Sequence, residues 1–165
     1  MTLSEITIAG IDPAMKLLPA KMDSVAALVQ LFAIGLQESR FEYRYQRISG
    51  SPGLKGPARG FWQFERGGGV TGVLTCDATA QRAKEVCIVR RVHPDSVAVW
   101  SALEFDDVLA AAFARLLLWS DPEPLPAIND ADGAWDLYIR MWRPGRPHRD
   151  TWDDFYQEAI AEVFE

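Results

Sequence analysis

The sequence predicts a mainly α-helical protein with a small extended or hairpin segment, arranged around one buried central helix. Over several segments, apolar residues recur at spacings of three and four, the period of one face of an α-helix. Residues 106–119, DDVLAAAFARLLLW, are apolar around most of the helix circumference, which indicates burial on all sides. Between residues 40 and 64 the pattern changes to alternation and glycine-containing turns, so we expect the extended segment there.

Length and composition are those of one globular domain. At 165 residues the chain is long enough to bury a core and too short for two domains of ordinary size. Its 48% hydrophobic and 24% charged residues are ordinary, so we expect neither disorder nor a membrane span. The net charge of −6, without a cluster of lysine and arginine, argues against nucleic-acid binding.

Residues 1–21 are predicted to form an N-terminal arm, followed by a single domain over residues 22–165. Gly10, Pro13 and Pro19 interrupt the arm, so we expect an extended segment with little regular structure that packs on the domain or on a partner. The arm lacks the basic start and sustained apolar core of a signal peptide. We therefore expect a protein made without one.

The first long helix is predicted from about residue 22, and Glu38 lies at its C-terminal end. A helix C-terminus carries partial negative charge, which disfavours a second negative charge and raises the pKa of a carboxyl group there. A raised pKa suits a general acid. On position alone, the favoured interpretation is that Glu38 is a solvated polar residue that closes an apolar stripe.

The segment after this helix predicts strands and turns. Residues 40–47 alternate aromatic and polar side chains, as a short strand does, and residues 50–57 are rich in glycine and proline, as a loop is. Residues 60–64 form a brief aromatic strand or turn. Gly67, Gly68 and Gly69 predict a turn or hinge and not a phosphate loop, because neither GxxxxGK[ST] nor GxGxxG is present.

Helices are expected over most of the remaining chain, because apolar residues again recur at helical spacing. Prolines at 122, 124 and 126 predict an extended connection between two of them. The expected helices cover about residues 77–91, 96–103, 106–119, 131–142 and 151–163.

The cysteines and histidines predict no special chemistry. Cys76 and Cys87 are eleven positions apart, and we expect two buried free thiols. His93 and His148 have no cysteine or histidine at metal-ligand spacing. We therefore expect neither a metal nor another cofactor.

Several aromatic residues lie in loops or at helix ends, where they can reach a cleft. Aromatic faces stack on the C–H faces of sugar rings, as on other amphipathic ligands. The alternative is that most of these side chains belong to the core. The candidates for a cleft are Phe61, Trp62, Phe64, Tyr138 and Trp142.

Three motifs in order resemble the lytic transglycosylase and goose-type lysozyme branch of the lysozyme-like superfamily. That branch has a helix ending in Glu-Ser, an SPxGAxG-type loop, and Gly-Leu-Met-Gln. The counterparts here are Glu38-Ser39, the residue 51–59 sequence SPGLKGPAR, and Gly60-Phe61-Trp62-Gln63. The resemblance is specific over about residues 22–66 and implies an α+β lysozyme-like fold.

The sequence departs from that branch at three points. The interval between the glutamate and the glutamine is longer, and Phe-Trp replaces Leu-Met, which makes the lining bulkier. The Ala-Tyr-Asn-x-Gly motif has no full match. Tyr138 lies in roughly the corresponding part of the chain, and we assign to it the role of the tyrosine in that motif.

The resemblance implies a muralytic enzyme that binds peptidoglycan glycan strands. It cleaves the β-1,4 bond between N-acetylmuramic acid and N-acetylglucosamine with Glu38 as general acid, and the muramic 6-hydroxyl then attacks to give a 1,6-anhydro product. Ser39 and Gln63 would hold substrate or orient Glu38. The implied substrate-binding residues are Ser39, Phe61, Trp62, Gln63, Phe64, Glu65, Tyr138 and Trp142.

Three other functions remain open. A hydrolytic lysozyme needs a second carboxylate, for which Glu65 is the nearest candidate, ahead of Glu42 and Asp77; Glu65 is equally a surface partner of Arg66. A chitinase-like glycosidase keeps the acid and changes the sugar. A virion structural protein keeps the fold without catalysis.

The C-terminal WRPG and TWDDFY segments resemble those of small phage-borne peptidoglycan hydrolases. This resemblance implies a virion-associated enzyme, made in the bacterial cytoplasm and delivered by the particle to the cell wall in the periplasm. Other virion proteins would then be partners of the N-terminal arm.

Overall fold

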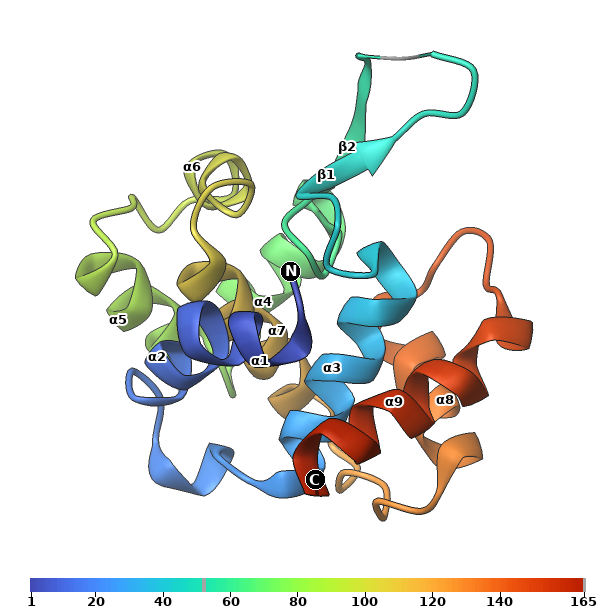
Figure 1. Cartoon of the computed structure of the whole chain (residues 1–165). Helices are drawn as coiled ribbons and strands as arrows, with labels where there is room; N and C mark the ends of the chain where they lie inside the picture. The colour runs from blue at the N-terminus through green and yellow to red at the C-terminus, as the bar shows by residue number, and fades with distance from the viewer. Residues whose placement is uncertain (52, 165) are drawn as a thin grey trace.

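The computed structural model describes residues 1–51 and 53–164 and is mainly helical, with a small antiparallel sheet that rises from one side (Figure 1). This agrees with the predicted mainly α-helical class with a small extended segment. Pro52, in the predicted loop, lies outside the described residues. The helical segments, with π- or 3-10 turns labelled η, are α1 (Leu3–Ile6), η1 (Thr7–Ile11), α2 (Asp12–Met15), η2 (Ala20–Met22), α3 (Val25–Ser39), η3 (Arg66–Val70), α4 (Thr71–Thr75), α5 (Ala80–Val89), α6 (Ser96–Ala102), α7 (Asp107–Trp119), α8 (Ala131–Trp142), η4 (Arg149–Thr151) and α9 (Trp152–Phe164). The strands are β1 (Tyr45–Arg47), β2 (Lys55–Arg59) and β3 (Phe64–Glu65).

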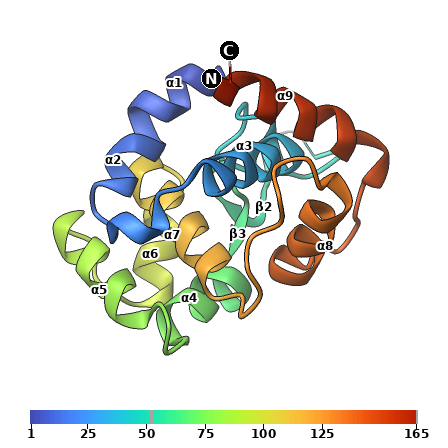
Figure 2. The same cartoon turned by 90° about the horizontal axis from the view of Figure 1, so that it is seen from below.

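Helix α7 is the buried helix that the sequence predicted. Every residue from Val108 to Leu118 is buried, as expected for a helix that is apolar on all sides. Asp106 begins the helix by accepting a hydrogen bond from the backbone N–H of Leu109 at 2.9 Å. Segments α2, η1, α3, α4 and α5 pack around α7 (Figure 2).

The N-terminal segment is helical, so the prediction of an extended arm was wrong. Thr2 and Glu5 form a capping box at α1, and Pro13 lies in the first turn of α2, where its missing N–H costs nothing. Ile6 and Ile11 are buried in the core. Gly10 permits a close approach to α7, because a Cβ atom there would lie 3.2 Å from the carbonyl oxygen of Asp107. The residues that interrupt the sequence pattern therefore serve helix packing.

Helix α3 ends where the sequence predicted, and its end is locked by a sharp turn. Arg40 and Phe41 both have φ of 52°, which reverses the chain. The hydroxyl of Ser39 donates to the carbonyl of Gly35 at 3.2 Å and accepts from the backbone N–H of Phe41 at 3.1 Å. The ring of Phe41 folds back onto Gly35, where any side chain would collide with it.

The three strands form an antiparallel sheet in the order β1-β2-β3. Tyr45 pairs with Arg59, and Ala58 pairs with Glu65. The predicted loop over residues 50–57 is thus wrong from Lys55 onward. Lys55 and Arg59 of β2 both form ion pairs with the carboxylate of Glu104, a long-range contact that local glycine and proline signals do not show.

The tight connection from β2 to β3 is made by residues 60–63. Gly60 has φ of +73°, and a Cβ atom there would lie 2.9 Å from the carbonyl oxygen of Leu103. Gly67, Gly68 and Gly69 were predicted to form a turn or hinge. They form one π-helical turn, η3, that continues into α4. Gly69 is needed there, because a Cβ atom would lie 2.7 Å from the ring of Phe64.

The later helices lie close to their predicted ranges. Helix α8 has the predicted bounds, and α6 and α9 differ from them by a residue or so, whereas α5 is shorter than predicted. Among residues 1–51 and 53–164, no helix is long and apolar enough to cross a membrane.

The turn after α3 generates a stability prediction. Gly35→Ala should lower the free energy of unfolding by about 2 kcal/mol, because the new methyl group displaces the buried ring of Phe41. Gly72→Ala in α4 meets nothing within 4 Å and should raise it by about 0.5–1 kcal/mol through helix propensity. Urea titration followed by circular dichroism measures both. Equal effects of the two substitutions would contradict this packing.

Candidate active site

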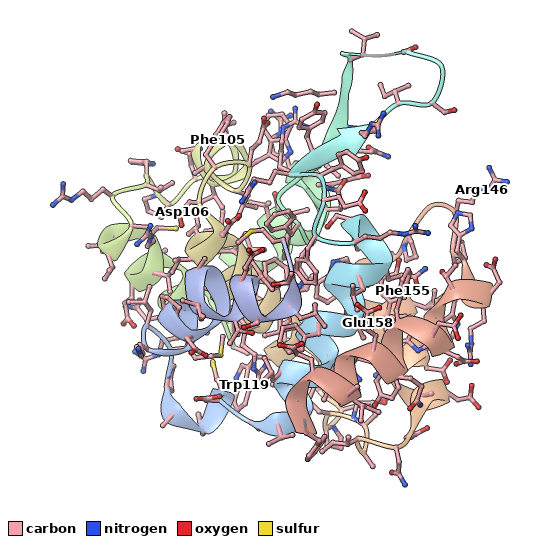
Figure 3. All side chains as sticks on the ribbon, viewed as in Figure 1. Phe105, Asp106, Trp119, Arg146, Phe155 and Glu158 are labelled. Carbon is pink, nitrogen blue, oxygen red and sulfur yellow. The ribbon has the colours of Figure 1, made fainter. Side chains whose placement is uncertain are left out.

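A cleft of about 1180 Å³ opens where the end of α3, the sheet, the η3–α4 segment and α8 meet. Gln46, Ala58 and Glu65 line it from the three strands. The predicted position of an extended segment beside a cleft is therefore confirmed. The loop of residues 143–148, which follows α8, lines the cleft as well, and Figure 3 shows Arg146 at the outer end of this loop.

Glu38 lies half-buried in this cleft and has an unusual protonation equilibrium. The hydroxyl of Tyr138 donates a hydrogen bond to Oε1 of Glu38 at 2.8 Å. Burial raises the pKa of Glu38 to about 7, the hydrogen bond from Tyr138 opposes that rise, and the negative charge of Glu65 adds to it. The predicted rise in the pKa of Glu38 is confirmed. Its main cause is burial and not the end of the helix.

Tyr138 is held in place by a stack of aromatic rings from α8 and α9. Its ring lies parallel to that of Trp152, with centroids 5.3 Å apart and planes 14° apart, and Trp152 stacks in turn on Tyr156. Burial and the neighbouring Glu38 raise the pKa of Tyr138 above its usual value. Tyr138 therefore keeps its proton at neutral pH and acts as a fixed donor to Glu38. Tyr138, predicted as a substrate-binding residue, thus lies in the cleft in contact with Glu38.

Gln63 and Glu65 both line the cleft, as the sequence predicted. Gln63 adopts φ of 50°, and its side-chain amide donates to the carbonyl of Gly60 at 2.8 Å, so part of the side chain stabilises the turn. Glu65 is exposed on β3. Its charge is close enough to contribute to the raised pKa of Glu38. The structure thus brings two carboxyl groups into one cleft.

Three predicted substrate-binding residues are buried and do not line the cleft, so these predictions were wrong. Ser39 uses its hydroxyl to close the end of α3. Phe61 and Trp62 pack their rings against Phe41, and the indole N–H of Trp62 donates to the carbonyl of Leu31 at 2.8 Å. Trp62 contacts the cleft residue Trp142 through its backbone carbonyl.

Phe64 and Trp142 do line the cleft, with unequal exposure. Phe64 is 2% exposed, so it presents little more than an edge, whereas Trp142 is half-buried. The indole N–H of Trp142 donates to the carbonyl of Trp62 at 2.9 Å, which fixes the ring at the end of α8. Trp142 is thus the predicted aromatic residue with most surface available for a ligand.

Sequence reasoning missed several cleft residues from the loop after α8. Arg143, Arg146 and His148 line the cleft, and Arg143 and Arg146 form no ion pair with any described residue. The side chain of Gln37 donates to the carbonyl of His148 at 3.0 Å and so ties this loop to α3. The WRPGRPH sequence shows a loop with cationic residues, but only the fold shows that the loop borders the cleft.

The cysteines of the chain differ in their position relative to the cleft. Cys76 and Cys87 are free thiols, as predicted, but Cys76 is half-buried and lines the cleft, whereas Cys87 is buried. Within the part of the chain that the structure describes, no group of three or more His, Cys, Asp or Glu residues is arranged to hold a metal ion.

Comparisons with models of known protein families, with curated proteins and with solved structures each found no match. The function of the cleft is therefore argued from its residues and their geometry.

Two substitutions should move the pKa of Glu38 in opposite directions. Tyr138→Phe removes the hydrogen bond that favours the carboxylate, so the pKa should rise above about 7. Glu65→Gln removes the nearby negative charge, so the pKa should fall. Carboxyl ¹³C NMR titration of glutamate-labelled protein measures both values. Shifts of the same sign would contradict the arrangement.

Proposed function

We propose that this protein cleaves the β-1,4 bond between N-acetylmuramic acid and N-acetylglucosamine in peptidoglycan, as a lytic transglycosylase with Glu38 as general acid and then general base. The observation that carries the proposal is the Glu38 carboxyl group, half-buried in a large cleft, bonded to Tyr138, and with a pKa raised to about 7. A carboxyl group that stays protonated near neutral pH is what protonation of a glycosidic oxygen requires.

The surroundings of Glu38 suit both of its roles. Before proton transfer, burial favours the neutral acid. After transfer, the hydroxyl of Tyr138 is already placed to donate to the new carboxylate, at 2.8 Å from Oε1. The bond from the anomeric carbon to the protonated glycosidic oxygen breaks, and N-acetylglucosamine leaves with a free 4-hydroxyl. The carboxylate then accepts the proton of the muramic 6-hydroxyl as that oxygen attacks the anomeric carbon, and the 1,6-anhydro ring closes. This sequence needs no second catalytic carboxylate.

The size and charge of the cleft support a charged polymer as the substrate. Its volume of about 1180 Å³ exceeds the roughly 300–1,000 Å³ of small-molecule pockets, so it can hold more than one sugar ring. Arg143, Arg146 and His148 line one side. Peptide stems on muramic acid carry carboxylates, whereas chitin carries none, so the guanidinium groups of Arg143 and Arg146 favour peptidoglycan over chitin as the substrate.

Hydrolysis is the second candidate reaction, and Glu65 is the observation that favours it. Glu65 lines the same cleft, and its charge acts on Glu38. A carboxylate in that position would stabilise the cationic transition state or activate water. The substrate and the general acid are the same in both reactions, and only the nucleophile differs.

Glu38→Gln should abolish the clearing of a suspension of purified peptidoglycan, because an amide cannot donate the proton, with a loss of activity of at least about a hundredfold. Glu158→Gln removes the same charge from an exposed position on α9 (Figure 3) and should leave clearing unchanged. Wild-type activity should fall as the pH rises through about 7, because Glu38 then loses its proton. Undiminished clearing by a folded Glu38→Gln protein would exclude the proposed role.

A further inference from the structure

A second cavity, of about 490 Å³, lies between the start of α3 and the end of α7. We call it the Arg115 cavity. Arg115 and Trp119 line it from α7, Lys21 and Ala26 line it from the start of α3 and the turn before it, and residues 121–125 close the remaining side. Its volume lies within the roughly 300–1,000 Å³ of small-molecule sites.

Arg115 is a buried cation without an acidic partner in this cavity. It is 2% exposed, and its Nε–H donates to the carbonyl of Met22 at 2.6 Å. Its Nη1 has no hydrogen-bond partner among the described residues. Burial lowers the pKa of Arg115 to about 10, so the guanidinium is still charged at neutral pH. A buried charge with an unpaired donor is costly unless a ligand completes it.

Two further positive groups converge on the same cavity. The ammonium group of Lys21 lies 5.1 Å from the centroid of the Trp119 ring, and the guanidinium of Arg115 lies 5.2 Å from it, so both cations border one ring. Figure 3 shows Trp119 near the segment that joins α2 to α3. The first turn of α3, a helix of 15 residues, adds the partial positive charge of its backbone N–H groups beside Ser24 and Ala26.

The acidic residues of the cavity are engaged elsewhere. Asp121 and Glu123 both bind the guanidinium of Arg140, at 2.6 Å and 3.1 Å. Asp23 acts on Arg115 only through its charge and forms no ion pair with it among the described residues. The rest of the lining is largely apolar and consists of Ala26, Leu118, Trp119, Pro122, Pro124 and Leu125.

We propose that the Arg115 cavity binds a small monocarboxylate with an apolar body, separately from the cleft that contains Glu38. The carboxylate accepts a hydrogen bond from Nη1 of Arg115 and lies near the ammonium group of Lys21. The apolar body packs against Trp119 and the proline-lined wall. A strongly hydrated dianion such as inorganic phosphate would leave these apolar walls without a partner, so it is the poorer ligand.

Isothermal titration of the full chain with hexanoate tests the proposal. Wild-type protein should bind one hexanoate, and hexanol and inorganic phosphate should each bind on the order of tenfold more weakly. Lys21→Gln should weaken hexanoate binding on the order of tenfold through the loss of one charged contact. Lys84→Gln, an equal charge change on the exposed face of α5, should leave it unchanged.

Arg115→Met replaces the cation by an apolar side chain of similar length and should abolish hexanoate binding. If the Arg115→Met protein does not fold, the hexanoate affinities of Lys21→Gln and Lys84→Gln test the proposal instead. The absence of saturable hexanoate binding to the wild-type protein would overturn the proposal, as would equal weakening by both lysine substitutions. A crystal structure in hexanoate that shows no carboxylate beside the guanidinium of Arg115 would overturn it too.

Discussion

The hydrogen bond between Tyr138 and Glu38 is the contact on which the candidate site depends. It joins two residues that are 100 positions apart in sequence, Glu38 of α3 and Tyr138 of α8. Packing fixes both helices. Tyr138 stacks on Trp152 of α9, and α9 in turn packs along α3, which carries Glu38. The three helices therefore hold one carboxyl group and its donor in register, so neither group must be ordered when a substrate binds.

The aromatic residues of the β2–β3 connection are buried beneath the cleft residues of the same segment and do not line the cleft. Phe61 and Trp62 are buried against Phe41, in the turn that closes α3. Their packing fixes where α3 ends and where Gln63 and Glu65 enter the cleft. In the proposed function, sugar rings therefore contact mainly Trp142 and the polar cleft residues.

Much of the fold and the central pair of the site could be predicted from sequence. Helical periodicity located α3, α7 and α8, because each buries a continuous apolar face. Motif order singled out Glu38, whereas Tyr138 was selected only by its rough position in the chain. The helices at the N-terminus escaped prediction because Gly10 and Pro13 are local breaking signals, whereas burial of Ile6 and Ile11 is a tertiary effect. Composition could not separate the buried Trp62 from Trp142 in the cleft, and only the fold brings residues 143–148 to the cleft.

Mass analysis of the fragments released from purified peptidoglycan tests the central claim most directly. We predict that every newly released anomeric end is N-acetylmuramic acid in the 1,6-anhydro form, with N-acetylglucosamine at the new non-reducing end, because Glu38 donates a proton to the glycosidic oxygen and then activates the muramic 6-hydroxyl. Reducing muramic ends, heavier by one water, would contradict the transglycosylase reaction and assign Glu65 to hydrolysis. New reducing ends at N-acetylglucosamine, or intact glycan with cleaved peptides, would contradict the assignment of this bond as the substrate.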